Sequence, residues 1–152
     1  MSTEFLDYEI LVNNTGSWPL PEGLMEDGVR SALESEGIQV AEVSLTLMDD
    51  GGIRELNLAY FGKDRPTDVI AFALHEAHGP ILGDVYIGFE QALRQANELS
   101  IPIQEELLRL AIHGTLHLLG FNHPEGDERF KSDMFLRQED LVQRRLSQGP
   151  LG

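Results

Sequence analysis

The chain has 152 residues, which is long enough for one domain with a hydrophobic core and too short for two domains of ordinary size. It has no cysteine, which excludes a disulfide scaffold, and its 26 acidic and 11 basic residues give a net charge of −15, which argues against broad, non-specific nucleic-acid binding. Because no apolar run approaches the ~20 residues needed to cross a bilayer and the N-terminus is acidic, we expect a single domain over residues 1–152, located in the cytoplasm.

The first two thirds of the chain alternate between β-rich runs and helical patterns. We expect strands at residues 8–12, 43–48, 68–74 and 81–87. We expect helices at residues 21–36, 53–60 and 90–99. A turn at residues 49–52 and another at 75–80 separate these elements, so the pattern predicts a small sheet interleaved with helices.

A long apolar helix follows. Ser100 is a good N-cap for it, with Pro102 in its first turn, and the stretch from Leu107 to Phe121 is apolar nearly all round, so this helix should run through the core. Gly114 lies inside it at a cost of ~1 kcal/mol relative to alanine, and we infer that another backbone or a bound substrate approaches closely there.

A final helix should follow the acidic turn at residues 124–128. We expect Phe130, Met134 and Leu141 to form its inward-facing stripe. Core packing is the preferred role for Met134, because its flexible thioether suits an irregular interior.

Three histidines lie within the stretch HGTLHLLGFNH. His113 and His117 are four residues apart, so a helix presents both imidazoles on one face. Gly120 can adopt the left-handed conformation that ends a helix, which would bring His123 back against the other two. Three imidazoles with an open fourth position are typical of a catalytic zinc site, so we predict one Zn²⁺ per chain at His113, His117 and His123. Imidazole also binds nickel, copper and iron, and the sequence alone leaves these open.

The same histidine spacing occurs in metzincin peptidases. Those enzymes place a glutamate, the general base, directly after the first histidine. Here that position is Gly114. The spacing of the metal ligands therefore agrees with the metzincins, but the general base that their peptidase reaction needs is missing.

Three motifs occur in order along most of the chain: LNLAYFGKDRPTDVIAF, LGDVYIG and HGTLHLLGFNH. With these motifs the chain resembles the YbeY-type endoribonucleases, also called rRNA maturation factors. The matching positions before the histidines are Asn57, Tyr60, Pro66, Thr67, Asp68, Gly83 and Asp84.

The resemblance implies both a fold and a function. The fold would be α+β, with a small mixed sheet, helices packed on it, and a metal cleft formed by a core helix and the following turn. The function would be zinc-dependent cleavage of single-stranded rRNA, including 16S rRNA 3′-end processing and ribosome quality control, with the small ribosomal subunit as partner and neither DNA nor membrane involved. His113, His117 and His123 would be the zinc ligands.

Two positions depart from the family pattern. In the family an arginine follows the tyrosine, and here Phe61 occupies that position. The loss of this arginine would remove a phosphate contact and a source of charge stabilisation. Lys63 and Arg65 are the nearby candidates to replace it, although a lysine does not reproduce the arginine fork. Asn122 replaces an aspartate before the third histidine, a milder change.

The sequence does not identify the catalytic base. Asp84 and Asp68 are weak candidates, since an aspartate at a strand edge is more often a cap or turn residue. Thr67, Lys63 and Arg65 are candidates for contacting the substrate.

Two further groups of residues have a functional and a plainer interpretation. Phe72, Phe89 and Phe121 could stack on bases, with core packing the preferred role. A local basic groove could come from arginines on the helices, with a solvated helix face the plainer interpretation. These are Arg94, Arg109, Arg144 and Arg145.

Three hypotheses remain open at this point. The favoured one is a metal-dependent endoribonuclease. The second is a zinc-binding ribosome-assembly factor with little catalysis of its own, which Phe61 favours. The third is a metallohydrolase of peptides or small amides, against which the missing glutamate after His113 argues.

Overall fold

The computed structural model describes residues 5–121 and 132–149. Its centre is a four-stranded sheet in the order β1-β2-β4-β3, in which β1, β2 and β4 are parallel and β3 is antiparallel to β4. The strands are β1 (Asp7–Asn14), β2 (Val40–Met48), β3 (Val69–Ala73) and β4 (Ile81–Gly88). The predicted α+β fold with a small mixed sheet is therefore confirmed.

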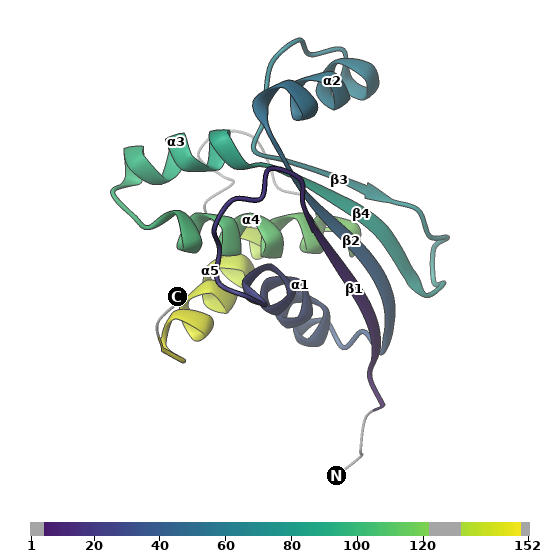
Figure 1. The fold of residues 1–152 in the computed structure, drawn as a ribbon. Helices are drawn as coiled ribbons and strands as arrows, with labels where there is room; N and C mark the ends of the chain where they lie inside the picture. Colours follow the sequence, from purple (N-terminus) through teal and green to yellow (C-terminus); the bar gives the residue numbers. More distant parts are fainter. Residues whose placement is uncertain (1–4, 122–131, 150–152) are drawn as a thin grey trace.

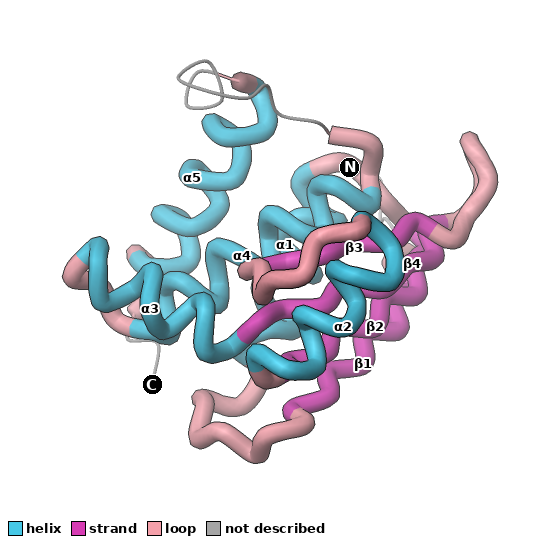
Figure 2. Tube along the Cα trace, turned by 90° about the horizontal axis from the view of Figure 1, so that it is seen from above, coloured by secondary structure: helices cyan, strands magenta, loops and turns pink. Residues whose placement is uncertain are grey.

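Five helices in the described part of the chain accompany this sheet. They are α1 (Leu24–Ser35), α2 (Asp50–Phe61), α3 (Phe89–Leu99), α4 (Ile103–Leu118) and α5 (Asp133–Leu146). Figure 1 shows α1, α4 and α5 on one side of the sheet and α2 at the end of the strands, and Figure 2 gives the view from above. None of the helices in the described part of the chain is long and apolar enough to span a membrane.

Side chains alternate between the two faces of the sheet. In β4, Val85 and Ile87 are fully buried under the helices, while Asp84 and Tyr86 between them point to the opposite face. Because Phe72 of β3 pairs with Asp84, it shares that opposite face. The sheet thus has a core face, covered by α1 and α4, and an open face, onto which only α2 packs among the described helices.

Helix α4 runs through the core, as its apolar sequence predicts. Leu107, Leu108 and Ile112 are fully buried. One row of side chains, spaced four residues apart on this helix, is only half-buried. The row is Glu105, Arg109, His113 and His117.

Helix boundaries correct several expectations. Ser100 is not the N-cap of α4: it ends α3 in the left-handed conformation with φ 56°, and Pro102 occupies the N-cap position. Residues 50–52, expected in a turn, form the first turn of α2, because the Asp49 side chain caps it by accepting a hydrogen bond from the Gly52 N–H at 2.8 Å. At its other end α4 stops at Leu118, short of the expected Phe121, and Gly120 has the predicted left-handed conformation with φ 94°.

The close approach at Gly114 comes from side chains and not from a backbone or a substrate. A Cβ there would lie 2.6 Å from Val85 Cγ1 and 3.1 Å from Val69 Cγ2, so the missing side chain lets α4 lie directly on β4 and β3. On α5, Met134 and Leu141 are buried as predicted, and Phe130 lies outside the described residues.

Candidate metal and substrate site

The two described histidines of the predicted metal site converge on one point. His113 Nε2 and His117 Nε2 are 3.2 Å apart, and the two rings stand nearly perpendicular at 77°. One helical turn separates the residues, so both rings leave α4 from its half-buried row. The third predicted ligand, His123, lies outside the described residues, and inside them no group of three His, Cys, Asp or Glu side chains completes a metal site.

A glutamine on α5 orients the first of these rings. Gln138 Oε1 lies 2.6 Å from His113 Nδ1, and the Gln138 amide nitrogen donates to Glu139 Oε2 at 3.0 Å. Since the amide nitrogen faces a carboxylate, the amide oxygen must face the ring, and His113 Nδ1–H is then the donor. In the neutral ring, this hydrogen bond places the lone pair on His113 Nε2, the atom next to His117. An outer partner that fixes the tautomer in this way is a regular feature of metal-binding histidines.

Behind the glutamine lies a cluster of charged residues between α4 and α5. Arg109 Nε donates to Glu139 Oε2 at 2.8 Å, while its terminal nitrogens reach Glu106 Oε1 and Glu105 Oε2, each at 3.1 Å. The Arg109 side chain is 17 % exposed and that of Glu106 only 5 %, so each charge is stabilised by its ion-pair partners in place of water.

The contacts within this cluster favour the charged forms of Arg109 and Glu139. Burial disfavours the guanidinium, but hydrogen bonds to the three carboxylates and the charge of Glu139 outweigh it and raise the pKa of Arg109. Burial also favours the neutral acid at Glu139, but the hydrogen bonds from Arg109 and Gln138 outweigh it and lower that pKa. Glu139 is therefore an ionised acceptor that holds the Gln138 amide in its orientation.

The histidines open into a pocket that several predicted substrate residues also line. We call this the histidine pocket; its polar lining consists of Asn57, Lys63, Thr67, Asp68, His113 and His117. Asp68 Oδ1 accepts the Val69 N–H at 2.8 Å, so its carboxylate is held at the start of β3. The structure thus brings Thr67, Asp68 and Lys63 together with the two histidines.

The loop carrying Lys63 and Arg65 is held by a buried side chain. Asn57 is 4 % exposed, and its Nδ2 donates to the Arg65 carbonyl at 2.9 Å. Lys63 and Arg65 make no ion pair with any residue that the structure describes. Their charges therefore remain available to an anionic ligand.

Asp84, the other candidate base, lies elsewhere. It is on the open face of the sheet and lines a different pocket with Phe72 and Tyr86, whereas the histidine pocket borders the core face. Asp84 does not line the histidine pocket: the two pockets meet at the edge strand β3, where they share Phe61, Ala71 and Ala73, and Asp84 lies on the far side of this boundary from His113 and His117.

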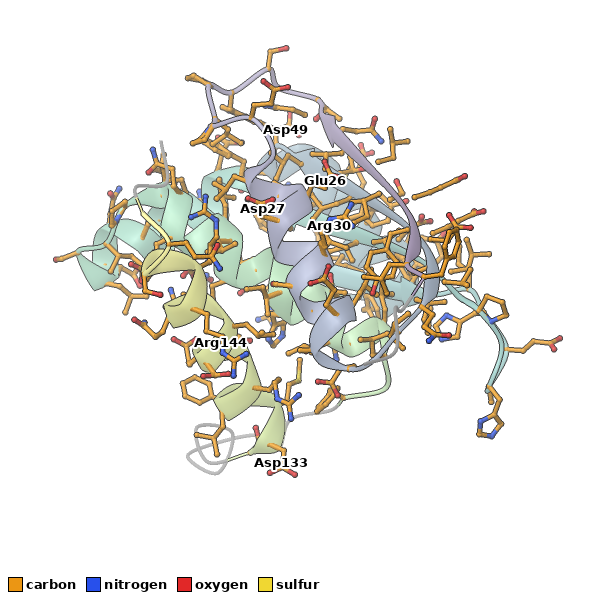
Figure 3. All side chains as sticks on the ribbon, turned by 90° about the horizontal axis from the view of Figure 1, so that it is seen from below. Glu26, Asp27, Arg30, Asp49, Asp133 and Arg144 are labelled. Carbon is orange, nitrogen blue, oxygen red and sulfur yellow. The ribbon has the colours of Figure 1, made fainter. Side chains whose placement is uncertain are left out.

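The four helix arginines are engaged with carboxylates and form no free basic groove. Arg94 pairs with Asp50, Arg144 with Asp140 and Arg145 with Asp27, and Arg109 belongs to the charged cluster described above. Figure 3 shows Arg144 on α5 and Asp27 on α1. The structure therefore supports the plainer interpretation, in which these four arginines belong to charged helix faces and not to a nucleic-acid groove.

The three phenylalanines have different environments. Phe89 is 9 % exposed and stacks on Trp18 at 4.4 Å, and Phe121 is half-buried against the core. Phe72 instead belongs to a group of aromatic rings on the open face.

Gln138 is a residue of the candidate site that the sequence did not point to. It stands four residues after Met134 and three before Leu141, within the inward stripe of α5. A polar residue in an apolar stripe is the available signal, since a buried amide must find a partner.

Removing this amide should weaken metal binding without unfolding the chain. For Gln138→Leu we expect the dissociation constant for zinc to rise about 10- to 100-fold, because the His113 ring loses its fixed tautomer and orientation. Competition with a chromogenic chelator measures this constant. Gln143→Leu, at an exposed position of the same helix, is the matched control and should leave it unchanged. Equal zinc affinity in both variants would show that Gln138 does not position the ring.

Comparisons of the sequence and of the structure with known proteins agree with one another. A family model described as Endoribonuclease YbeY matches residues 16–145. The chain is 40 % identical over 139 residues to "Endoribonuclease YbeY" of Persephonella marina, covering 88 % of this chain and 90 % of the relative. It is 39 % identical over 147 residues to the Bacillus subtilis protein of the same name, covering 87 % and 91 %. A solution structure of a Thermotoga maritima protein aligns with a TM-score of 0.61 at 31 % identity, covering 93 % of this chain and 90 % of that one.

Proposed function

Because the chain belongs to the YbeY endoribonuclease family, as its motifs predict, we propose that it is a zinc-dependent endoribonuclease that cleaves single-stranded RNA. The observation that carries this proposal is the convergence of His113 Nε2 and His117 Nε2 in a pocket lined by Lys63, Thr67 and Asp68. Neutral imidazoles beside a lysine, a hydroxyl and a carboxylate suit metal-assisted attack on a phosphodiester.

We propose His113, His117 and His123 as the ligands of one zinc ion. The described part of the set fits, since the Gln138 contact leaves the His113 Nε2 lone pair directed toward His117. A bound zinc would supply Lewis acidity toward a phosphoryl oxygen and lower the pKa of water to about 7.

The remaining lining residues then have distinct roles in the proposal. Asp68 is the candidate acceptor for the proton of the attacking water, and its Oδ1 is fixed by the Val69 N–H. The Thr67 hydroxyl can donate a hydrogen bond to a phosphate oxygen, and Lys63 can offset the phosphate charge; Arg65, exposed on the same loop, does not line the pocket. The P–O bond to the leaving nucleotide breaks as the water oxygen bonds to phosphorus.

A peptidase of the metzincin type has no structural support. Its general base would stand at position 114, where the space for a side chain is filled by Val85. A glutamate could not occupy this position without separating α4 from the sheet.

We propose rRNA as the substrate and the small ribosomal subunit as the partner, following the family resemblance. The expected reactions are 16S rRNA 3′-end processing and ribosome quality control, in the cytoplasm where ribosomes mature. No DNA or membrane partner is proposed.

Cleavage of rRNA fragments should depend on both strandedness and metal. We expect zinc-loaded protein to cut a single-stranded 16S 3′-end fragment, to leave the same fragment intact when it is paired to a complementary strand, and to lose activity on chelation and regain it with added zinc. Gel analysis of end-labelled RNA measures this. Zinc and RNA binding without any chelator-sensitive cleavage would instead support the ribosome-assembly factor, which the Phe61 substitution favours.

A further inference from the structure

A group of aromatic rings lies on the open face of the sheet, where the end of α2 packs over β3. Tyr60 and Phe72 have ring centroids 4.9 Å apart, and Phe61 stacks parallel to Phe72 at 6.2 Å with an angle of 8°. Tyr86 of β4 meets Phe72 edge-on at 6.0 Å. These rings, together with Asp84, line a hollow that we call the aromatic pocket.

The outer rings of this pocket are largely exposed to solvent. Tyr60 is 65 % exposed and Phe61 53 % exposed, although they are adjacent in sequence at the end of a helix. Phe72 is half-buried beneath them, but covering Phe72 does not by itself account for two large rings held in water. Aromatic faces presented in this way are typical of surfaces that stack on a ligand.

The aromatic pocket is continuous with the histidine pocket. Phe61, Ala71 and Ala73 line both of them, so a ligand can pass from the histidines across the Phe61 ring without leaving the surface. Lys63 lies on the histidine side of this path and forms no ion pair with a described residue. A phosphate near Lys63 would therefore place the neighbouring base against the aromatic rings.

From this arrangement we propose that the aromatic pocket is a stacking subsite for an unpaired base of the RNA strand whose phosphodiester lies in the histidine pocket. The inference rests on the proposed function and adds to it the element that selects single strands. A base held in a duplex is stacked on its neighbours and cannot reach the Phe61 and Tyr60 rings.

The polar groups of the pocket suit a base and not a phosphate. Asp84 lines it, and a carboxylate repels phosphate but accepts hydrogen bonds from the amino groups of bases. The Tyr86 phenol is protonated at neutral pH, as in any tyrosine, and can donate a hydrogen bond; burial, and then the charges of Asp84 and Tyr60, raise its pKa further. Phosphate binding is left to Lys63, which lines the neighbouring histidine pocket.

Removing the Phe61 ring should weaken RNA binding only by the contribution of the stacked base. We expect Phe61→Leu to raise the dissociation constant of zinc-loaded protein for a short single-stranded RNA about 5- to 150-fold, as for the loss of one stacked base. Stopped-flow fluorescence anisotropy reads binding before cleavage. We then measure binding to a series of oligonucleotides, each lacking the base at one position. At one position, loss of the base should weaken binding to the wild type by a similar factor. Loss of the same base should not weaken binding to Phe61→Leu any further, because the ring that it stacks on is already absent.

Two controls make the result specific. Phe5→Leu changes an 80 % exposed phenylalanine that precedes β1, at the opposite edge of the sheet from β3, and should bind RNA as the wild type does. Lys63→Ala should weaken every oligonucleotide equally and reduce the salt dependence of binding, since it contacts phosphate.

The outcomes separate this inference from the proposed function. If the wild type binds and cleaves single-stranded RNA but neither Phe61→Leu nor Tyr60→Leu changes the dissociation constant, the stacking subsite is refuted and the nuclease stands. If the wild type binds no RNA, both are refuted. A wild-type dimer that Phe61→Leu converts to monomer, with RNA binding unchanged, would assign the rings to contact between two copies of the chain.

Discussion

His117→Ala should lose its bound zinc and cleave RNA at least about a hundredfold more slowly than the wild type, because metal catalysis contributes several kcal/mol to such reactions. His117 Nε2 lies 3.2 Å from His113 Nε2, so removing this ring leaves at most one donor from α4. The expected stoichiometry therefore falls from one zinc per chain toward zero. Elemental analysis of the purified protein measures the zinc, and cleavage of end-labelled RNA measures the rate.

His75→Ala is the matched control for this substitution. His75 lies in the turn before β4, where its Nδ1 contacts the Leu82 backbone, and it lines a pocket distinct from the histidine pocket. Zinc content and cleavage should match the wild type. A His117→Ala protein that retains a full equivalent of zinc and cleaves normally would show that the metal, or the reaction, lies elsewhere in the chain.

Arg109→Met should lower the free energy of unfolding by about 3 kcal/mol, because it leaves neighbouring buried carboxylates without their counter-ion. Glu106, at 5 % side-chain exposure, and Glu139, at 27 %, lose the shared guanidinium, while methionine retains much of the arginine stem's packing. Urea unfolding at neutral pH measures the difference. Arg144→Met is the control, since its pair with Asp140 is exposed at 70 % and 51 % and should contribute less than about 1 kcal/mol.

The effect of Arg109→Met should depend on pH in a defined direction. Arg109 lowers the pKa of Glu139 in the folded protein, so the stabilisation is complete above the pKa of a glutamate in the unfolded chain. It is lost as the pH falls through the lower, folded-state value, where Glu139 takes up its proton. The difference between wild type and variant should therefore shrink in acid; a difference that stayed constant down to acid denaturation would show that packing, not charge, was removed.

The sequence predicts the parts of this molecule that depend on local periodicity. Four-residue spacing places His113 and His117 on one face of a helix, and Gly120 ends that region with the left-handed conformation expected of it. The strands and most helices likewise follow from periods of two and 3.6 residues.

Other parts depend on contacts between distant segments, which spacing does not encode. Gln138 reaches His113 across 25 positions because α5 docks on α4, and Asp84 lies away from the histidines because alternation along β4 directs it to the open face. Whether an arginine is free or paired also depends on tertiary structure: Arg94 meets Asp50 across 44 positions. The role of His123 stays a prediction.

The hydrogen bond between Gln138 of α5 and His113 should couple the docking of α5 on α4 to the proposed binding of zinc. Zinc, if it binds the ring that Gln138 orients, favours the state in which α5 is docked on α4, and a docked α5 favours zinc by the same factor. Any substitution that loosens α5, however far from the histidines, should then lower the affinity for zinc. Conversely, the metal-loaded chain should hold its C-terminal helix against proteases that cut the apo form.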